Sequence, residues 1–202
     1  MAVTTFAAID IGSYEVSMRI FELSKRIGFR ELDDVRFRLE PGKTVYSTGT
    51  LSMEMVDSIC EVLIDFKRIM AEFGVEEWRA CATSAFRELK NPLIVIEQIY
   101  RRTGIRIEVL SNAEQHFLGY KSIAAIETGF KKIIQKGTAI LDLGGGSLQV
   151  SLFDKDALVT TQNLKIGSLR IRERLRELEK SCNHYDQLVE EFIRNDLVGF
   201  ER

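Results

Sequence analysis

The sequence is poor in the residues that mark several common classes of protein. Its three cysteines, Cys60, Cys81 and Cys182, form no CxxC pair, and the chain has 202 residues. Without a paired framework they indicate reduced thiols in a cytoplasmic protein rather than a disulfide scaffold. The two histidines, His116 and His184, are not spaced as metal ligands usually are, so we expect no histidine metal site.

Long apolar runs and a strong net charge are absent as well. No apolar stretch reaches about 18 residues, so we expect no transmembrane helix. The N-terminus shows no basic segment followed by an apolar stretch and a cleavage site, so we expect no secretion signal. The net charge of −2 predicts no general attraction to polyanions. The P-loop pattern is missing too, and we expect neither a membrane nor a nucleic acid as partner.

Two short segments, residues 8–14 and 140–147, carry the clearest chemical signal. Each reads as an apolar strand followed by an aspartate, a glycine turn and a hydroxyl residue. Asp10 and Asp142 would stand at strand ends, where they could reach a divalent cation. Glycine turns let main-chain N–H groups approach phosphate oxygens closely. The pair predicts a duplicated domain with a phosphate-holding cleft between its halves.

The chain has 45% hydrophobic residues, enough to bury one large core or two small ones. Alternation over residues 15–23 predicts a strand that returns from a first strand at 5–11 in a hairpin. Ser52 is a candidate N-cap of a helix with apolar residues at helical spacing, which should end before Gly74. Further elements are expected as a strand at 28–39, a strand at 78–82, a helix capped by Asn91, a strand at 105–110 and a helix from Ser111 to about Thr128.

After Gly137 the same pattern restarts. Three strands are expected at 138–142, 148–153 and 157–165, followed by helices from Ser168 and from about His184. This order indicates an α/β fold with a mixed sheet flanked by helices. It divides the chain into a first domain at 1–136 and the opening of a second, incomplete copy at 137–202. The absent later strands would leave a sheet edge unpaired, which favours a homodimer.

Several stretches resemble the exopolyphosphatase / guanosine pentaphosphate phosphatase (Ppx/GppA) family, within the actin–Hsp70–sugar kinase superfamily. Residues 10–14 (DIGSY) are similar to its first phosphate loop, and residues 142–147 (DLGGGS) to its DxGGGS loop. Residues 82–85 (ATSA), with Arg87 and Asn91, are similar to a third signature. The resemblance implies duplicated domains of the ribonuclease-H-like, actin-like ATPase fold.

The same resemblance extends to about residue 175. Residues 107–111 lead into the helix that holds the catalytic glutamate in the family. A strand-to-helix turn is matched by Leu164, Ile166, Gly167 and Arg170. The ordered set is specific, whereas a single Asp-x-Gly turn is common.

The resemblance implies hydrolysis of a phosphoanhydride, which depends mainly on positioning and charge neutralisation. Arg87 could bind a phosphate through two hydrogen bonds. Asp10 and Asp142, together with Gln149, would hold Mg²⁺ or alternatively Mn²⁺, because hard cations prefer oxygen ligands. Main-chain N–H and hydroxyl groups would bind phosphate at Gly12, Ser13, Tyr14, Gly144, Gly145, Gly146 and Ser147.

Two glutamines stand where the family has glutamates. The catalytic position falls on Gln115, between Glu114 and His116, and Gln149 replaces the glutamate that follows the second loop. A glutamine can orient a water molecule but cannot accept its proton, and Glu114 is rotated about 100° from Gln115 on a helix. Loss of a general base costs about 10²- to 10⁴-fold in rate. We therefore expect bound substrate with slow or absent turnover, with Gln115, Glu114 and Arg87 as the catalytic candidates.

Most of these residues also have a purely structural interpretation. Arg87 could form a surface ion pair, and Tyr14 could be a packing residue. Both histidines could be exposed or satisfied in a core. The arginines at 170–176 alternate around a helix with glutamates among them, which favours a solvated face over a stripe for polyanions.

Four functions stay open from the sequence. The leading one is a hydrolase of inorganic polyphosphate or pppGpp, and the residues do not separate these two substrates. The second is a non-catalytic regulator that binds polyphosphate or a nucleotide. The third is a relative of sugar or acetate kinases, against which the lack of an adenosine-binding loop argues. The fourth is a truncated product that needs a partner to fold.

Overall fold

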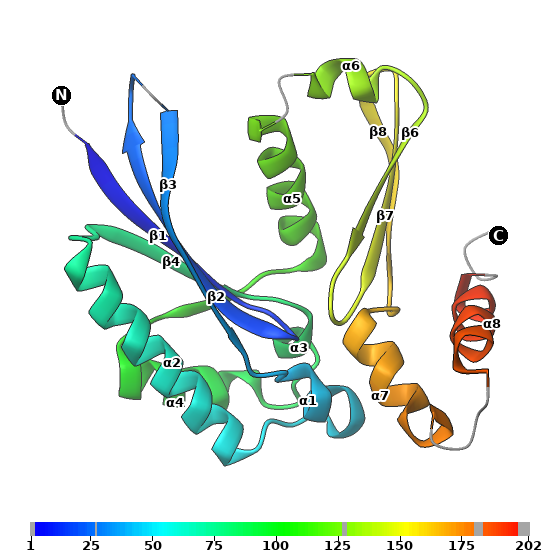
Figure 1. The fold of residues 1–202 in the computed structure, drawn as a ribbon, viewed down its shortest axis with the longest axis horizontal. Helices are drawn as coiled ribbons and strands as arrows, with labels where there is room; N and C mark the ends of the chain where they lie inside the picture. Colours follow the sequence, from blue (N-terminus) through cyan, green and yellow to red (C-terminus); the bar gives the residue numbers. More distant parts are fainter. Residues whose placement is uncertain (1–2, 27, 127–128, 180–183, 198–202) are drawn as a thin grey trace. The chain divides into compact units, whose positions relative to one another are not determined.

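The computed structural model describes residues 3–26, 28–126, 129–179 and 184–197 (Figure 1). The chain forms two compact units, Met1–Ser111 and Asn112–Arg202. Among the described helices, none has the length and apolar character needed to cross a membrane.

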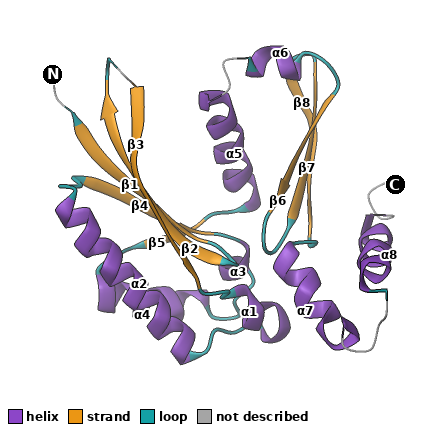
Figure 2. Cartoon of the chain, viewed as in Figure 1, coloured by secondary structure: helices purple, strands orange, loops and turns teal. Residues whose placement is uncertain are grey.

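The first unit contains a five-stranded mixed sheet in the order β3-β2-β1-β4-β5 (Figure 2). β2 pairs antiparallel with both β1 and β3, whereas β1–β4 and β4–β5 are parallel pairs. The strands are β1 (Thr4–Ile11), β2 (Glu15–Ser24), β3 (Gly28–Arg38), β4 (Glu77–Ala82) and β5 (Ile107–Val109). The predicted hairpin and the mixed sheet are confirmed.

Helices pack against the apolar face of this sheet. The long helix α2 (Met53–Glu72) begins at Ser52, whose Oγ accepts a hydrogen bond from the N–H of Met55 at 3.2 Å, as the sequence predicted. Its apolar stripe joins the core formed by β1 and β2, in which Ile11, Val16 and Phe66 are all fully buried. The other helices are α1 (Gly42–Thr48), α3 (Ser84–Arg87) and α4 (Pro92–Thr103).

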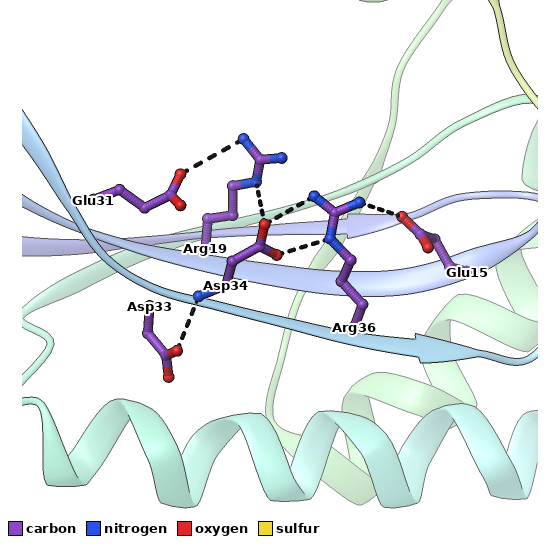
Figure 3. A network of polar contacts seen from close by, with 6 residues as sticks. All are labelled: Glu15, Arg19, Glu31, Asp33, Asp34 and Arg36. Atoms are coloured by element: carbon purple, nitrogen blue, oxygen red, sulfur yellow. Dashed lines mark hydrogen bonds and ion pairs between the residues drawn. The ribbon is translucent and has the colours of Figure 1, made fainter.

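The outer face of β2 and β3 carries a network of charged side chains (Figure 3). Arg19 and Arg36 both contact the carboxylate of Asp34, at 3.3 and 2.8 Å, and Arg36 also reaches Glu15 at 3.2 Å. The hydrogen bond from Arg36 lowers the pKa of Asp34. The network lies in solvent, where screening by water leaves each ion pair with little effect on stability.

The second unit contains an antiparallel sheet in the order β6-β7-β8. Its centre includes Val150 and Phe153 of β7, and the ring of Tyr120 packs edge-on against Phe153 with centroids 5.3 Å apart. The elements are α5 (Asn112–Ile126), α6 (Phe130–Ile134), β6 (Thr138–Leu143), β7 (Leu148–Asp154), β8 (Ala157–Leu164), α7 (Ser168–Glu179) and α8 (Tyr185–Leu197).

The predicted strands and helices of the second half are all present, with ends shifted by one or two residues. The compact unit begins at Asn112 and includes α5 and α6, whereas the sequence pattern restarts at Gly137. The division at residue 136, which concerns the repeat, stays a prediction. The described cysteines are free thiols: Cys60 is buried, which raises its pKa, and Cys81 is half-buried. Cys182 lies outside the described residues.

Candidate phosphate-binding loops

The first loop is a tight hairpin turn between β1 and β2. The N–H of Gly12 donates to the carbonyl oxygen of Glu15 at 2.9 Å, so this N–H closes the turn. A Cβ at Gly12 would lie 3.1 Å from the same oxygen, which explains why the position suits glycine. The main-chain donors left to the loop as phosphate ligands are therefore those of Ser13 and Tyr14.

The residues at the start of α1 form hydrogen bonds with this loop. The N–H groups of Gly42 and Glu40 donate to the carbonyl oxygens of Ser13 and Tyr14, each at 2.9 Å. The guanidinium of Arg38 lies 4.7 Å from the centre of the Tyr14 ring, so the ring packs against a cation. Both carbonyl oxygens are thus engaged within the protein.

Three hydroxyl groups meet beneath the first loop. Ser13 Oγ lies 2.5 Å from Tyr46 Oη and 2.7 Å from Ser84 Oγ, and the last two atoms are 3.0 Å apart. Ser13 and Ser84 are both buried. In such a ring each hydroxyl can donate once and accept once, so every oxygen keeps a lone pair but no spare proton. Ser13 can donate to a phosphate only if this ring opens.

Asp10 is the last residue but one of β1, opposite Ser17 in β2 and next to Cys81 in β4. Its side chain keeps accessible surface, but the surrounding protein displaces much of the bulk water. This desolvation, together with the charge of Glu15, raises the pKa of Asp10 to about 6. Both effects disfavour the ionised carboxylate of Asp10, and a bound cation would favour it.

Arg87 follows the ATSA segment at the end of α3. Its Nη1 donates to the carbonyl oxygen of Leu110 at 2.7 Å, just after β5. The side chain is half-buried, and desolvation lowers its pKa. This contact fixes the guanidinium near the carboxyl ends of the parallel strands β4 and β5, the edge at which open α/β sheets usually bind ligands.

The second loop repeats the hairpin of the first. The N–H of Gly144 donates to the carbonyl oxygen of Ser147 at 2.9 Å, as Gly12 does to the residue three positions on. Asp142 pairs across the hairpin with Gln149, seven residues later, and Asp10 likewise pairs with Ser17. The main-chain donors left to this loop are those of Gly145 and Gly146.

The start of α7 packs directly onto the glycine-rich loop. The N–H groups of Ser168 and Leu169 donate to the carbonyl oxygens of Gly144 and Gly145, at 3.1 and 3.0 Å. A Cβ at Gly167 would lie 2.3 Å from the carbonyl oxygen of Gly145, closer than any side chain permits. The glycine-rich loop and the start of α7 therefore contact each other directly through main-chain atoms.

Arg170 completes this contact. Its side chain is buried, and its Nε donates to the carbonyl oxygen of Gly146 at 2.8 Å. A solvated face, predicted for the whole arginine tract, is wrong for Arg170. It is confirmed for Arg174 and Arg176, whose side chains are 49% and 53% exposed.

A polar cluster lies between α5 and the sheet of the second unit. Gln149 Nε2 donates to Tyr120 Oη at 3.0 Å, and Tyr120 Oη lies 2.5 Å from Ser151 Oγ. From Ser151 the contacts continue to Thr161 Oγ1 at 3.1 Å and from there to His116 Nδ1 at 3.2 Å. If Gln149 donates and each hydroxyl passes one hydrogen bond onward, His116 accepts at Nδ1.

A cavity of about 240 Å³ adjoins this cluster, and its lining includes Asp142, Gln149 and His116. Asp142 and Gln149 therefore face the same space, but the amide nitrogen of Gln149 is turned to the hydroxyl groups. Of the two histidines, His116 is buried and hydrogen-bonded, and His184 is exposed, as the structural interpretation expected.

Gln115 and Glu114 both lie in the first turn of α5. Gln115 is half-buried, whereas Glu114 is exposed. The two side chains therefore meet different surroundings, in agreement with their angular separation on the helix. The assignment of the catalytic position to Gln115 stays a prediction.

The described residues contain no group of three or more histidine, cysteine or acidic side chains placed to hold a metal ion. Single carboxylates at Asp10 and Asp142 nevertheless fit Mg²⁺. This ion keeps several waters and is commonly bound by one or two carboxylates plus substrate phosphates.

Sequence reasoning missed two contributors to the first loop. Tyr46 lies in the short helix α1, which has no recognisable periodicity, and Ser84 was noted only as part of a motif. Their contacts with Ser13 span 33 and 71 residues, so no local pattern could have predicted them.

The mixed sheet and the two aspartate–glycine hairpins define a protein of the actin-like ATPase fold. A solved Ppx/GppA family member from Aquifex aeolicus is 26% identical, with a TM-score of 0.69 over 85% of this chain and 54% of that chain. The model of the Ppx/GppA phosphatase family matches residues 24–198. The chain belongs to this family.

The match with each of two curated relatives covers only part of the relative's length. A bifunctional 3-dehydroquinate synthase/phosphatase of Fusobacterium nucleatum is 24% identical over 96% of this chain and 30% of its own length. Exopolyphosphatase 2 of Mycobacterium tuberculosis is 26% identical over 92% of this chain and 57% of its own length. The chain thus spans less than two thirds of either relative.

Proposed function

We propose that this chain is the phosphate-binding part of a phosphoanhydride hydrolase, which releases terminal phosphate from inorganic polyphosphate or guanosine pentaphosphate. The observation that carries the proposal is the repeated hairpin, with an aspartate at the strand end and the same N–H to carbonyl bond in each turn. Membership of the Ppx/GppA phosphatase family and the likeness to an exopolyphosphatase support it.

The loops would bind phosphate mainly through main-chain groups. Ser13 and Tyr14 supply N–H donors in the first loop, and Gly145 and Gly146 supply them in the second. The carbonyl oxygens of Ser13, Gly144 and Gly145 share peptide planes with the N–H groups of Tyr14, Gly145 and Gly146, and all three oxygens are already hydrogen-bonded, so these three donors are oriented before substrate arrives. Such pre-orientation lowers the cost of organising charge stabilisation during phosphoryl transfer.

Asp10 and Asp142 would hold Mg²⁺ through water or directly. The ion supplies charge neutralisation for phosphate oxygens when it is bound. Arg87 would contribute a fixed positive charge, since its guanidinium is anchored to Leu110. Each of these groups binds or orients, and none of them removes a proton.

Gln115 would orient the attacking water without accepting its proton. We therefore expect slow turnover, lower by about 10²- to 10⁴-fold than a glutamate would give. The structure is consistent with this role because Gln115 is the more enclosed of the two candidate side chains.

The test is phosphate release from polyphosphate and from pppGpp in the presence of Mg²⁺. Asp10→Asn and Asp142→Asn should each lower the rate at least tenfold, whereas Asp65→Asn, which removes a surface carboxylate paired with Arg68 on α2, should not. The two substrates, assayed side by side, show which one is preferred. Binding of either substrate with no release from any variant would instead indicate a regulator.

A further inference from the structure

Tyr46 brings a hydroxyl group to the first phosphate loop from a separate helix. It lies in α1, and its Oη contacts Ser13 Oγ at 2.5 Å and Ser84 Oγ at 3.0 Å. α1 also packs against α3, the single turn of helix that begins at Ser84 and ends at Arg87. The phenol of Tyr46 therefore lies where the first loop, α1 and α3 meet.

The three hydroxyl residues differ in burial. Ser13 and Ser84 are 4% and 8% exposed, whereas Tyr46 is only half-buried. A ligand that approaches the loop from solvent therefore reaches the tyrosine more readily than either serine. A phenol is also a stronger hydrogen-bond donor than an aliphatic hydroxyl, because it is more acidic.

The charge of Arg87 lies close to this phenol. Ser84 and Arg87 are three residues apart on the turn of α3, so their side chains leave the helix on the same side. Desolvation lowers the pKa of Arg87, and its Coulomb interaction with Tyr46 acts in the opposite direction. Because Coulomb interactions weaken with distance, this effect agrees with the short contact between Tyr46 and Ser84. One phosphate group can therefore meet the phenol and the guanidinium together.

The hydroxyl ring can open into a chain that ends at Tyr46. Ser13 then donates to Ser84 and Ser84 donates to Tyr46, through the existing contacts of 2.7 and 3.0 Å. The proton of Tyr46 becomes available to a further acceptor, and only its bond with Ser13 is exchanged. Successive hydrogen bonds polarise one another, which strengthens the last donor of the chain.

We propose that Tyr46 is a phosphate-binding residue of the first loop, whose phenol donates a hydrogen bond to the same phosphate as Arg87. The ligand class is the terminal phosphate of a phosphoanhydride chain. The hydroxyl of Ser13 then supports Tyr46 through Ser84 instead of binding the phosphate itself. This inference rests on the proposed function, because it assigns a further residue to the same site.

Titration calorimetry of this chain with inorganic tripolyphosphate, without divalent cations, tests the assignment. Tyr46→Phe keeps the aromatic ring but removes the donor, so it should raise the Kd about tenfold, as loss of a hydrogen bond to a charged group does. Ser84→Ala is the matched control: it breaks the same hydroxyl ring but leaves the phenol, and should change the Kd less than twofold. An unchanged Kd for Tyr46→Phe, or equal weakening by both variants, overturns the proposal.

Fluorine NMR separates direct contact with the ligand from a change in stability. A fluorotyrosine in place of Tyr46 should give a resonance that shifts when tripolyphosphate is added. The same label in place of Tyr100, which is 38% exposed on α4, should give a resonance that does not shift. A resonance at residue 46 that stays unchanged while calorimetry shows binding contradicts the proposal.

Phosphate release by the same variants with Mg²⁺ separates this inference from the hydrolase activity. Weaker binding by Tyr46→Phe, with no release from any variant, keeps Tyr46 as a ligand and rejects the hydrolase. Release by the wild type, with equal binding by wild type and Tyr46→Phe, rejects the role of Tyr46 and keeps the hydrolase. A wild type that does not bind tripolyphosphate overturns both.

Discussion

Arg170 donates from Nε to the main-chain oxygen of Gly146 at 2.8 Å, from a side chain that is only 5% exposed. The bond joins the first turn of α7 to the glycine-rich loop, 24 residues earlier. A buried guanidinium is costly unless its protons are used, so its presence indicates that the loop geometry depends on it. Together with the close contact at Gly167, it attaches the second loop to the start of α7.

Replacement of Arg170 by lysine should therefore weaken the second unit. A lysine keeps the charge but cannot place a planar N–H at the position of Nε, and Gly146 loses its partner. We expect a loss of about 1–3 kcal/mol in the free energy of unfolding, measured by urea denaturation. Arg176→Lys, at a side chain that is 53% exposed, should change it by less than about 0.5 kcal/mol. Equal effects at both positions would argue against a structural role for Arg170.

Gly167→Ala should displace the glycine-rich loop. The added Cβ would lie 2.3 Å from the carbonyl oxygen of Gly145, so main chain must move rather than a flexible side chain. We expect a lower melting temperature and loss of phosphate release. Gly129→Ala is the control, because a Cβ there meets nothing within 4 Å and the φ of −97° suits any residue. An unchanged melting temperature for Gly167→Ala would contradict the close contact between loop and helix.

Tyr46→Phe tests the hydroxyl ring below the first loop. Removing one hydroxyl leaves Ser13 with Ser84 as its remaining partner in this ring, and we expect a loss of about 0.5–1.5 kcal/mol in stability. The freed Ser13 should also bind phosphate with altered affinity, which isothermal titration with inorganic phosphate can measure. Tyr100→Phe, whose ring is 38% exposed, should leave both quantities unchanged. If the two phenylalanine variants behave alike, the ring has no part in the loop.

Asp10 should make stability depend on pH. Its pKa is raised from the ordinary 3.8 to about 6, so the folded chain holds this proton more tightly than the unfolded chain. The resulting stabilisation is complete below about pH 4 and is lost as pH rises through 6. Asp10→Asn should therefore become more stable than the wild type between pH 4 and 7, with the difference growing across that window. Urea unfolding at several pH values checks this, and a constant difference would contradict it.

The sequence was most informative where one short pattern sets one element. The alternation of Val16, Met18 and Ile20 predicted a strand with one buried face, and all three side chains are buried. Ser52 was predicted as a helix cap and acts as one. The short helices α1, α3 and α6 were missed because four to seven residues carry no readable periodicity.

Contacts between residues far apart in the chain could not be predicted from the sequence, for a physical reason. The burial of Arg170 depends on a carbonyl oxygen whose position is set by a turn elsewhere in the chain. The N–H groups of Gly12 and Gly144 each form a hydrogen bond within their own turn, and this too follows from main-chain geometry that residue types do not specify. The motifs located both loops correctly in the chain, but they could not tell which N–H groups were already used.

The proposed function combines intact phosphate loops with a missing general base at residue 115. It is tested most directly by phosphate release from polyphosphate and pppGpp with Mg²⁺, comparing the wild type with Gln115→Glu and with Glu114→Gln as control. We expect a slow wild type, a gain of about a hundredfold in Gln115→Glu, and no loss in Glu114→Gln. A fast wild type whose activity disappears in Glu114→Gln would contradict it and would make Glu114 the base.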